Sequence, residues 1–444
     1  MNEFIHTINN FLVTYVLVFV LIAIGITFTI YLALPQFKYF KQSIKESFQD
    51  LFSKDKKNGI SALQAMMISI SAQVGTGNII GVATAISLGG AGAIFWMWVS
   101  AFFGMATILA EGILAQKYKV RKDGHYIGGP AFYIKLGVKK ILGKKVANAL
   151  SVFFAIAIII ALGCAGQMTQ SNSIAGALKE AFNIENYISG IVVAIVAAFV
   201  VIGGVKRIAR FAEIVVPFMA ICYVLVAIFV MIKFHSHILD VLSSIVKQAF
   251  GLEEVIGGAA GIGIKEAIRY GVARGLFANE AGMGSTPHAH ASAHTKNTVS
   301  QGFVAMLAVF IDTAFICTAT ALIILLSGAD LKLSGILLST QAFYLSFGDI
   351  GVKLLAICLV FFAFTTIIGW YYFAQINVLY LFNSKALKYF KAIFVFCIFF
   401  GSLLEIKFVW ELSDLCNTLM VLPNAIALFL LAKVVKQELK KNNF

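Results

Sequence analysis

Gln73-Val74-Gly75-Thr76-Gly77-Asn78 interrupts an apolar stretch, about 60–86, that is otherwise long enough to cross a bilayer. Glycine destabilises a helix by roughly 1 kcal/mol relative to alanine. Backbone N–H and C=O groups left unpaired in lipid carry a further large cost. A helix break at this depth therefore persists only where it lines a cavity or binds a ligand. In membrane carriers, such breaks hold the anionic end of a substrate and a coupling cation.

The composition around this stretch is that of a polytopic membrane protein. Of the 444 residues, 60% are hydrophobic and 13% are charged, and the mean hydropathy is +0.90. These values exclude an ordinary soluble domain. The net charge of +14 does not indicate nucleic-acid binding, because the basic residues lie between apolar stretches rather than in one patch. The six cysteines occur singly and are interpreted as packing residues, without disulfide or metal roles.

Apolar stretches of spanning length predict the fold class: an all-α polytopic membrane protein with about eleven transmembrane helices, forming one domain over 1–444. Basic residues concentrate in alternate loops, so the positive-inside rule predicts the N-terminus outside and the C-terminus in the cytoplasm. The predicted spans are 11–36, 60–86, 92–115, 148–178, 187–203, 211–232, 256–285, 299–327, 350–382, 390–404 and 416–434.

A second set of interruptions lies five spans after the first. The seventh span contains Gly271-Val272-Ala273-Arg274-Gly275 and then Asn279-Glu280-Ala281-Gly282. Interrupted segments at corresponding positions of two halves indicate an inverted repeat. We therefore predict an accessory helix over 11–36, a first repeat over about 60–232 and a second repeat over about 256–434.

The first interruption has the chemistry of an ion and carboxylate site. If the helix restarts near Asn78, its free amides and positive dipole end suit a carboxylate, and the Thr76 hydroxyl adds a donor. The carbonyls of Ser71 and Val74 are hard oxygen ligands suited to Na⁺. In the ninth span, Thr365 and Thr366 could complete an oxygen shell, although adjacent hydroxyls in an apolar helix often only bond back to their own helix. Trp370, four residues after Thr366, would face the same pocket.

Other buried polar residues have two interpretations each. Gln170, in a polar cluster of the fourth span, could bind a ligand or only another helix. Asp312 could couple an ion or serve a structural hydrogen bond. Glu111 and Glu213 lie near predicted cytoplasmic helix ends and are expected to pair with lysine or arginine. Arg274 and Glu280 are expected to stabilise the seventh-span break or a gate.

Neither a metal site nor an enzyme is predicted. His288, His290 and His294 lie in a short segment without a neighbouring cysteine or carboxylate, which disfavours metal binding. The sequence has no catalytic motif and no phosphate-cradling loop before a lysine.

Several strings together resemble the alanine/glycine:cation symporter family, in order from about residue 71 to 375. They are Gly75-Thr76-Gly77-Asn78-Ile79-Ile80-Gly81, Ala93-Ile94-Phe95-Trp96-Met97-Trp98, Gly104-Met105-Ala106-Thr107, Gly128-Gly129-Pro130, Gly275-Leu276-Phe277-Ala278-Asn279-Glu280-Ala281-Gly282-Met283-Gly284-Ser285 and the run 365–372. The sequence departs from the usual family pattern at Ala72-Gln73, where a Gly-Thr pair is common.

The resemblance implies a leucine-transporter-like fold with a five-plus-five inverted repeat, and it implies roles for particular residues. The Thr76 and Gly77 amides and Asn78 would hold the substrate carboxylate. Gln170, Phe277, Thr366 and Trp370 would complete the substrate pocket. The carbonyls of Ser71, Val74 and Phe362, with the hydroxyls of Thr365 and Thr366, would hold sodium.

We therefore predict a sodium-coupled symporter that imports alanine or glycine by alternating access, with Na⁺ as the co-transported ion and no cofactor. The family resemblance implies a bacterial inner membrane. The alternative is a proton-coupled or exchange-type carrier of the same fold, in which Asp312 would titrate. A channel is less well supported because no filter string is visible, and a membrane enzyme because no catalytic set is present.

Overall fold

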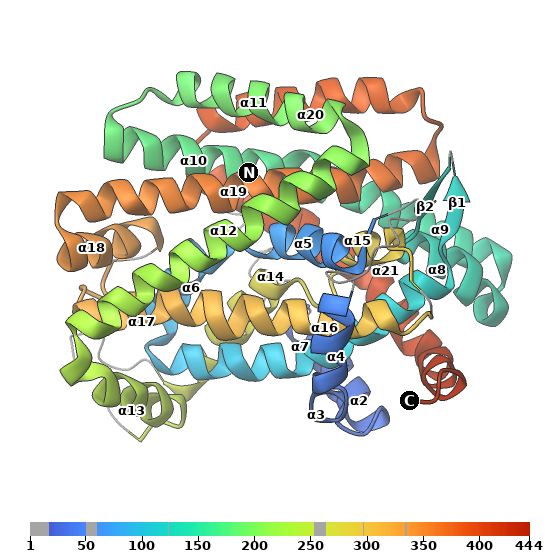
Figure 1. The fold of residues 1–444 in the computed structure, drawn as a ribbon, viewed down its shortest axis with the longest axis horizontal. Helices are drawn as coiled ribbons and strands as arrows, with labels where there is room; N and C mark the ends of the chain where they lie inside the picture. Colours follow the sequence, from blue (N-terminus) through green and yellow to red (C-terminus); the bar gives the residue numbers. More distant parts are fainter. Residues whose placement is uncertain (1–16, 50–59, 123, 253–262, 296, 334) are drawn as a thin grey trace.

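The computed structural model describes residues 17–49, 60–122, 124–252, 263–295, 297–333 and 335–444, apart from the side chains of 406–408. Long helices run back and forth along one axis of the molecule (Figure 1). One antiparallel hairpin joins β1 (Val120–Lys122) to β2 (His125–Ile127), with Val120 opposite Ile127. The predicted all-α polytopic fold class is confirmed.

Seven helical segments of the described chain are long and apolar enough to cross a membrane, or eight if one bent pair counts as a single span. The bent pair is α5 (Ala62–Gln73) with the segment Gly77–Gly89, a π-helical turn (Gly77–Gly81) followed by α6 (Val82–Gly89). The seven are α7 (Gly92–Lys117), the run Pro130–Phe182, α12 (Gly204–Lys233), the run Ser300–Ser327, α19 (Asp349–Leu381), α20 (Ala386–Leu403) and Val409–Lys441 of α21 (Ile406–Lys441).

Three predicted spans coincide with helices outside that group. These helices are α2 (Val18–Tyr31), α11 (Asn186–Ile202) and α14 (Ile264–Asn279). Residues 11–16 and 256–262 of the predicted first and seventh spans lie outside the described residues. The count of eleven spans and the inverted repeat therefore stay predictions.

Two of the long runs contain π-helical turns. Such turns are rare and occur frequently at functional sites. The π turn Ala161–Ala165 precedes Gln170, and the π turn Ile311–Cys317 contains Asp312. The first run consists of α8 (Pro130–Tyr133), a π turn (Ile134–Val138), α9 (Lys139–Ile160), a π turn (Ala161–Ala165) and α10 (Gly166–Phe182). The second consists of α16 (Ser300–Phe310), a π turn (Ile311–Cys317) and α17 (Thr318–Ser327).

Several short helices lie where the sequence analysis placed loops. One of them, α13 (Ile238–Ala249), packs its last turn against α7. The Trp96 indole of α7 donates a hydrogen bond to the carbonyl of Ala249 in α13 over 3.1 Å. The short helices are α3 (Pro35–Lys38), α4 (Phe40–Phe48), a 3₁₀ turn (His235–His237), α13 (Ile238–Ala249), α15 (Pro287–Ser292) and α18 (Gly335–Phe347).

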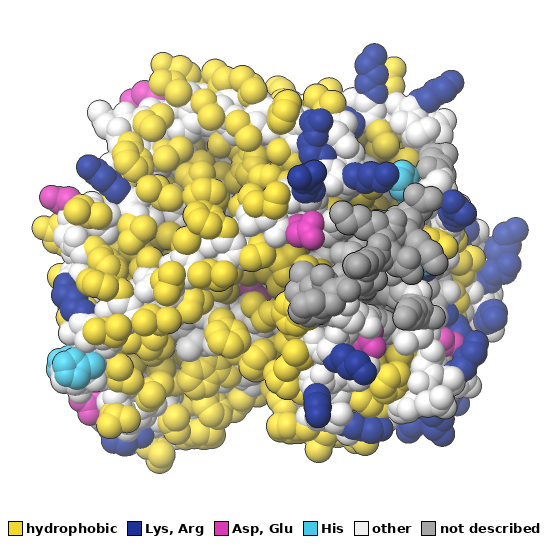
Figure 2. Space-filling model, viewed as in Figure 1, with side chains coloured by type: hydrophobic (Ala, Val, Ile, Leu, Met, Phe, Trp, Pro, Cys, Tyr) yellow, Lys and Arg dark blue, Asp and Glu magenta, His cyan; other side chains and the backbone are white. Residues whose placement is uncertain are grey.

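The surface supports a membrane location. Figure 2 shows apolar side chains over most of the visible face, with Lys and Arg gathered toward the right edge, over the hairpin and α9. Large apolar side chains such as Phe199, Ile195 and Phe396 are more than half exposed, which suits contact with lipid. We call the end of the molecule that holds the β1–β2 hairpin the basic end.

The predicted interruption at Gly271–Gly275 is wrong, because α14 runs through it without a break. These glycines permit close approach to α7 instead. A Cβ atom at Gly271 would lie 2.8 Å from the Trp96 Cβ, and one at Gly275 would lie 3.2 Å from the Met97 Cα. Small residues commonly allow such contact between membrane helices. The helix ends only at Glu280, whose φ is +55°.

Candidate functional site

The first helix break, residues 74–76, separates α5 from the Gly77–Gly89 segment, and the two segments meet at a bend of 53°. Asn78 fixes this break from within, because its side-chain oxygen accepts a hydrogen bond from the Gly75 amide over 2.9 Å. Its amide nitrogen donates to Asp312 over 2.6 Å. Asp312 thus acts on the break through Asn78. Both side chains are fully buried.

Carbonyl oxygens converge on Thr366 beside the first break. The Thr366 hydroxyl lies 3.1 Å from the Ser71 carbonyl oxygen, 3.4 Å from that of Val74 and 3.0 Å from that of Phe362. A hydroxyl donates only one hydrogen, so it satisfies these three acceptors one at a time. The arrangement therefore gathers oxygen atoms of the kind that bind a hard cation.

Four of the five predicted sodium ligands meet at the Thr366 hydroxyl, and the fifth, Thr365, contacts only one of them, the Phe362 carbonyl oxygen. The Thr365 hydroxyl lies 3.0 Å from the Phe362 carbonyl oxygen and 3.4 Å from the Met219 sulfur of α12. The contact between α5 and α19 also depends on a glycine. A Cβ atom at Gly75 would overlap the Thr366 hydroxyl and lie 3.3 Å from the Thr366 Cβ.

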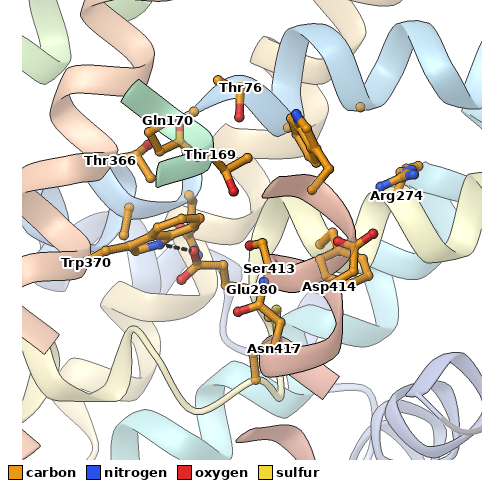
Figure 3. A pocket seen from close by; sticks show the side chains of 18 residues that line it. Thr76, Thr169, Gln170, Arg274, Glu280, Thr366, Trp370, Ser413, Asp414 and Asn417 are labelled. Carbon is orange, nitrogen blue, oxygen red and sulfur yellow. Dashed lines mark hydrogen bonds between the residues drawn. The ribbon is translucent and has the colours of Figure 1, made fainter. Parts of the chain in front are cut away.

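A cavity of about 50 Å³ lies between the first break and helices α10, α14, α19 and α21 (Figure 3). Asn78 is the one predicted substrate residue that does not line it, because its side chain is engaged with Gly75 and Asp312. The predicted substrate residues that line the cavity are Thr76, Gly77, Gln170, Phe277, Thr366 and Trp370.

The walls of this cavity carry buried polar atoms without a partner in the described part of the chain. They are the side-chain oxygens of Gln73, Thr76, Gln170 and Asn417, all on residues at most 5% exposed. A buried polar atom without a hydrogen bond is costly, and few occur in native proteins. Four around one cavity therefore point to a polar ligand.

Helix α21 contributes a wall that the sequence analysis missed. Trp410, Ser413, Asp414 and Asn417 follow the spacing i, i+3, i+4 and i+7, which places them on one helix face. The predicted last span began at 416, because apolar residues alone set its start. Polar residues at helical spacing just before that span were the available signal. Arg274 of α14 lines the same cavity, on the side where Asp414 lies in Figure 3.

The second helix break, residues 280–286, follows α14 and lies against the cavity. The Glu280 carboxylate accepts hydrogen bonds from the Trp370 indole over 2.6 Å and from the Ser285 hydroxyl over 2.5 Å. Gln73, next to the first break, donates to the Asn279 carbonyl over 2.8 Å. The two breaks are therefore directly connected.

The expected pairing of Glu111 with lysine or arginine is wrong. Glu111 is fully buried and accepts hydrogen bonds from the Gly282 amide over 2.9 Å and from the Asn424 side chain over 2.6 Å. Gly282 lies in the irregular segment after α14, where its backbone N–H has no helical partner, and a carboxylate satisfies such a donor well. Glu213 likewise accepts from an amide, that of Gln64, over 2.9 Å.

His288 and His290, beyond the second break, are fully buried and hydrogen-bonded within the protein. His288 contacts the Ser285 carbonyl at 2.6 Å and the Asn377 amide at 2.8 Å, and His290 contacts Gln301 at 2.9 Å. Burial lowers the pKa of His288 and of His290 to about 4, so both rings are neutral at physiological pH. In the described ranges no group of three or more His, Cys, Asp or Glu side chains is arranged to hold a metal.

Comparison with known proteins gives matches over almost the whole chain. The model of the sodium:alanine symporter family matches residues 1–443. The amino-acid carrier protein AlsT of Bacillus subtilis is 41% identical over 98% of this chain and 90% of its own length. The sodium/alanine symporter AgcS of Methanococcus maripaludis is 37% identical over 99% and 96%. The "Probable sodium/glutamine symporter GlnT" of Bacillus subtilis is 40% identical over 97% and 88%.

Proposed function

The chain belongs to the sodium:alanine symporter family of amino-acid:cation symporters, and we propose that it carries alanine or glycine together with Na⁺ by alternating access. The family is one of carriers rather than enzymes, which supports the proposal that the cavity is a transport site. The observation that carries the choice of Na⁺ is the convergence of three carbonyl oxygens on the Thr366 hydroxyl.

In this proposal sodium binds among the carbonyl oxygens of Ser71, Val74 and Phe362. The hydroxyl groups of Thr366 and Thr365 would rotate so that their oxygens face the ion. Ion binding would fasten the end of α5 to α19, because its ligands come from both helices. An oxygen-only set without a thiolate or imidazole favours a hard cation. The overlap that a side chain at Gly75 would produce supports the idea that this contact is kept close.

The amino acid would occupy the adjacent cavity. Its carboxylate would meet the Thr76 hydroxyl and the first-turn amides of Thr76 and Gly77, where the helix dipole is positive. Its ammonium group needs acceptors, and the unpartnered oxygen of Gln170 is one. Phe277 and Trp370 would limit side-chain size. The volume of about 50 Å³ lies far below the roughly 300–1,000 Å³ of pockets for drug-sized ligands and favours a small substrate.

We further propose that the protein lies in a bacterial inner membrane with its basic end, and hence its C-terminus, in the cytoplasm. The two helix breaks would begin the repeats at about 60–232 and 256–434. Sodium entering under the membrane potential would then drive uptake by ~2.3 kcal/mol per charge per 100 mV.

The test is uptake of labelled alanine into proteoliposomes, with an inward Na⁺ gradient compared with an equal K⁺ gradient. We expect accumulation only with Na⁺, and competition by unlabelled glycine but not by glutamine. Equal uptake in both gradients would overturn sodium coupling and favour a proton-coupled or exchange carrier. Sodium-driven uptake of glutamine without uptake of alanine would overturn the choice of substrate.

A further inference from the structure

The second break is fastened to the rest of the molecule by a polar cluster outside the cavity. The Glu111 carboxylate of α7 accepts from the Gly282 amide and from the Asn424 side chain of α21. Asn424 also donates to the Gly282 carbonyl over 2.8 Å, so Glu111 binds the amide of Gly282 while Asn424 binds its carbonyl. The Tyr133 hydroxyl of α8 donates to the Asn424 oxygen, which keeps the Asn424 NH₂ group directed at Glu111. Three helices thereby hold one glycine of the break.

The partners of the Glu111 carboxyl group are both hydrogen-bond donors. Each carboxylate oxygen receives a hydrogen from a donor, and the described residues form no ion pair with Glu111. A buried carboxylate without a cation is costly unless such donors remain in place. Any movement that withdraws Gly282 and Asn424 would therefore leave a buried carboxyl group without its hydrogen-bond donors.

The fastened segment borders the cavity and leads into α15, which contacts β2 at the basic end. Glu280 and Met283 line the cavity, whereas Gly282, between them, faces Glu111. Gly282 has a φ of +84°, in the left-handed region that favours glycine. The chain can therefore direct one residue outward between two that face inward. A molecule that left the cavity past this segment would have to displace it.

We propose that Glu111 is a positioning residue of the inner gate: its carboxylate latches the second break, through Gly282 and Asn424, over the cavity. Release of this latch opens the path to the basic end. The latch rests on the proposed function only in assuming that the chain alternates between two openings. It is separate from the ion and substrate residues, which lie on the other side of the break.

The experiment measures exposure of the break rather than transport. Thr286 ends the break, is fully buried and has an unpartnered hydroxyl, so Thr286→Cys supplies a small reporter. Inside-out vesicles are treated with a membrane-impermeant maleimide, and the chain without the reporter cysteine gives the background from the native thiols. We expect Glu111→Gln to raise the labelling rate of the reporter about tenfold, the factor for losing one charge-assisted hydrogen bond. Labelling in right-side-out vesicles should not change.

A matched control separates the latch from general loosening. Glu46 of α4 is also a buried glutamate held by uncharged donors, among them Gln42 and Ser300. Glu46→Gln should leave the labelling rate at the wild-type value. Asn424→Ala, which removes the second contact, should raise it as Glu111→Gln does, and it serves if Glu111→Gln does not fold.

Wild-type labelling rates in both latch variants would overturn the proposal, as would an equal rise with Glu46→Gln. The proposed function is judged separately. Raised labelling in a chain that transports no alanine would support the latch and refute the substrate. Unchanged labelling together with normal sodium-driven uptake of alanine would refute the latch and support the proposed function.

Discussion

The two helix breaks of this protein differ in what holds them. The first, at 74–76, presents neutral groups: carbonyl oxygens, a hydroxyl and amides, with its one acid, Asp312, acting through Asn78. The second, at 280–286, is held by two carboxylates, Glu111 and Glu280, whose oxygens are taken up by protein donors. A break with converging free acceptors is suited to bind an ion, and a break whose contacts are already satisfied is suited to close a path. Under the two proposals above, helix breaks of one kind would serve two different roles.

The largest effect is expected where the first break meets α19. Gly75→Ala should lower sodium-driven uptake by about 100-fold, since the new Cβ would overlap the Thr366 hydroxyl and displace the α5 carbonyls. Uptake is measured per folded protein in proteoliposomes. Gly176→Ala, in α10 with nothing within 4 Å of its added Cβ, is the control and should change uptake less than about twofold. Near-normal uptake by Gly75→Ala would show that the ion site does not depend on this contact.

Asn78→Ala tests whether the first break is fixed from within. It leaves the Gly75 amide and the Asp312 carboxylate without their partner, and each unpaired group costs about 1–3 kcal/mol. We expect uptake to fall about 30-fold, with a higher half-saturation concentration for alanine.

The control for Asn78 is Asn172→Ala. Asn172 is also buried and bonds two carbonyls, of Gly401 and Leu404, but lies away from the cavity. This variant should lose folded protein and keep the wild-type half-saturation concentration. If both variants raise that concentration equally, Asn78 contributes only packing.

Thr366→Ala sharpens the assignment of the ion to the first break. Removing the hydroxyl should raise the sodium concentration for half-maximal uptake about tenfold, which corresponds to one ligand worth about 1.4 kcal/mol. Thr366→Ser keeps the oxygen and should stay near the wild-type value. A loss of uptake that is the same at every sodium concentration would contradict an ion-ligand role.

The smallest effect is expected at the link between the cavity and the second break. Trp370→Phe removes the indole donor to Glu280 and should raise the alanine half-saturation concentration about fivefold, in keeping with the net worth of one hydrogen bond. Trp98→Phe loses a similar bond, to Thr318 over 2.9 Å, outside the cavity. Equal shifts in the two variants would mean that the Glu280 contact has no special part in binding.

The sequence predicted the first break well because its signal is local. Gly75, Thr76 and Gly77 are costly in lipid wherever they lie, so no knowledge of the partner helix was needed. The same reasoning failed at Gly271 and Gly275. Two glycines four residues apart also allow close helix contact, and only the position of α7 tells the two uses apart.

Partners supplied by distant helices could not be predicted. Glu111 was matched with nearby basic residues in the sequence, whereas its donors come from Gly282 and Asn424, more than a hundred residues away. The polar face of α21 was missed because apolar length set the span boundary, although Ser413, Asp414 and Asn417 lie at helical spacing. Thr366, by contrast, was selected from the sequence because its hydroxyl oxygen and the carbonyl oxygens before the first break are the same type of cation ligand. The structure places this hydroxyl against the Ser71 and Val74 carbonyl oxygens.

The single bond from Gln73 to the Asn279 carbonyl bears on how efficiently the ion gradient is converted into work. A potential of 100 mV offers ~2.3 kcal/mol per charge, enough for about a 50-fold accumulation of a neutral solute with one sodium. A carrier reaches that accumulation ratio only if the ion never crosses the membrane without the co-transported solute. The Gln73 amide joins the end of α5 to the end of α14, and under the proposed function this bond would make the two breaks move together. Loosening that link would cause slippage, which would register in the final accumulation ratio before it registered in the initial rate.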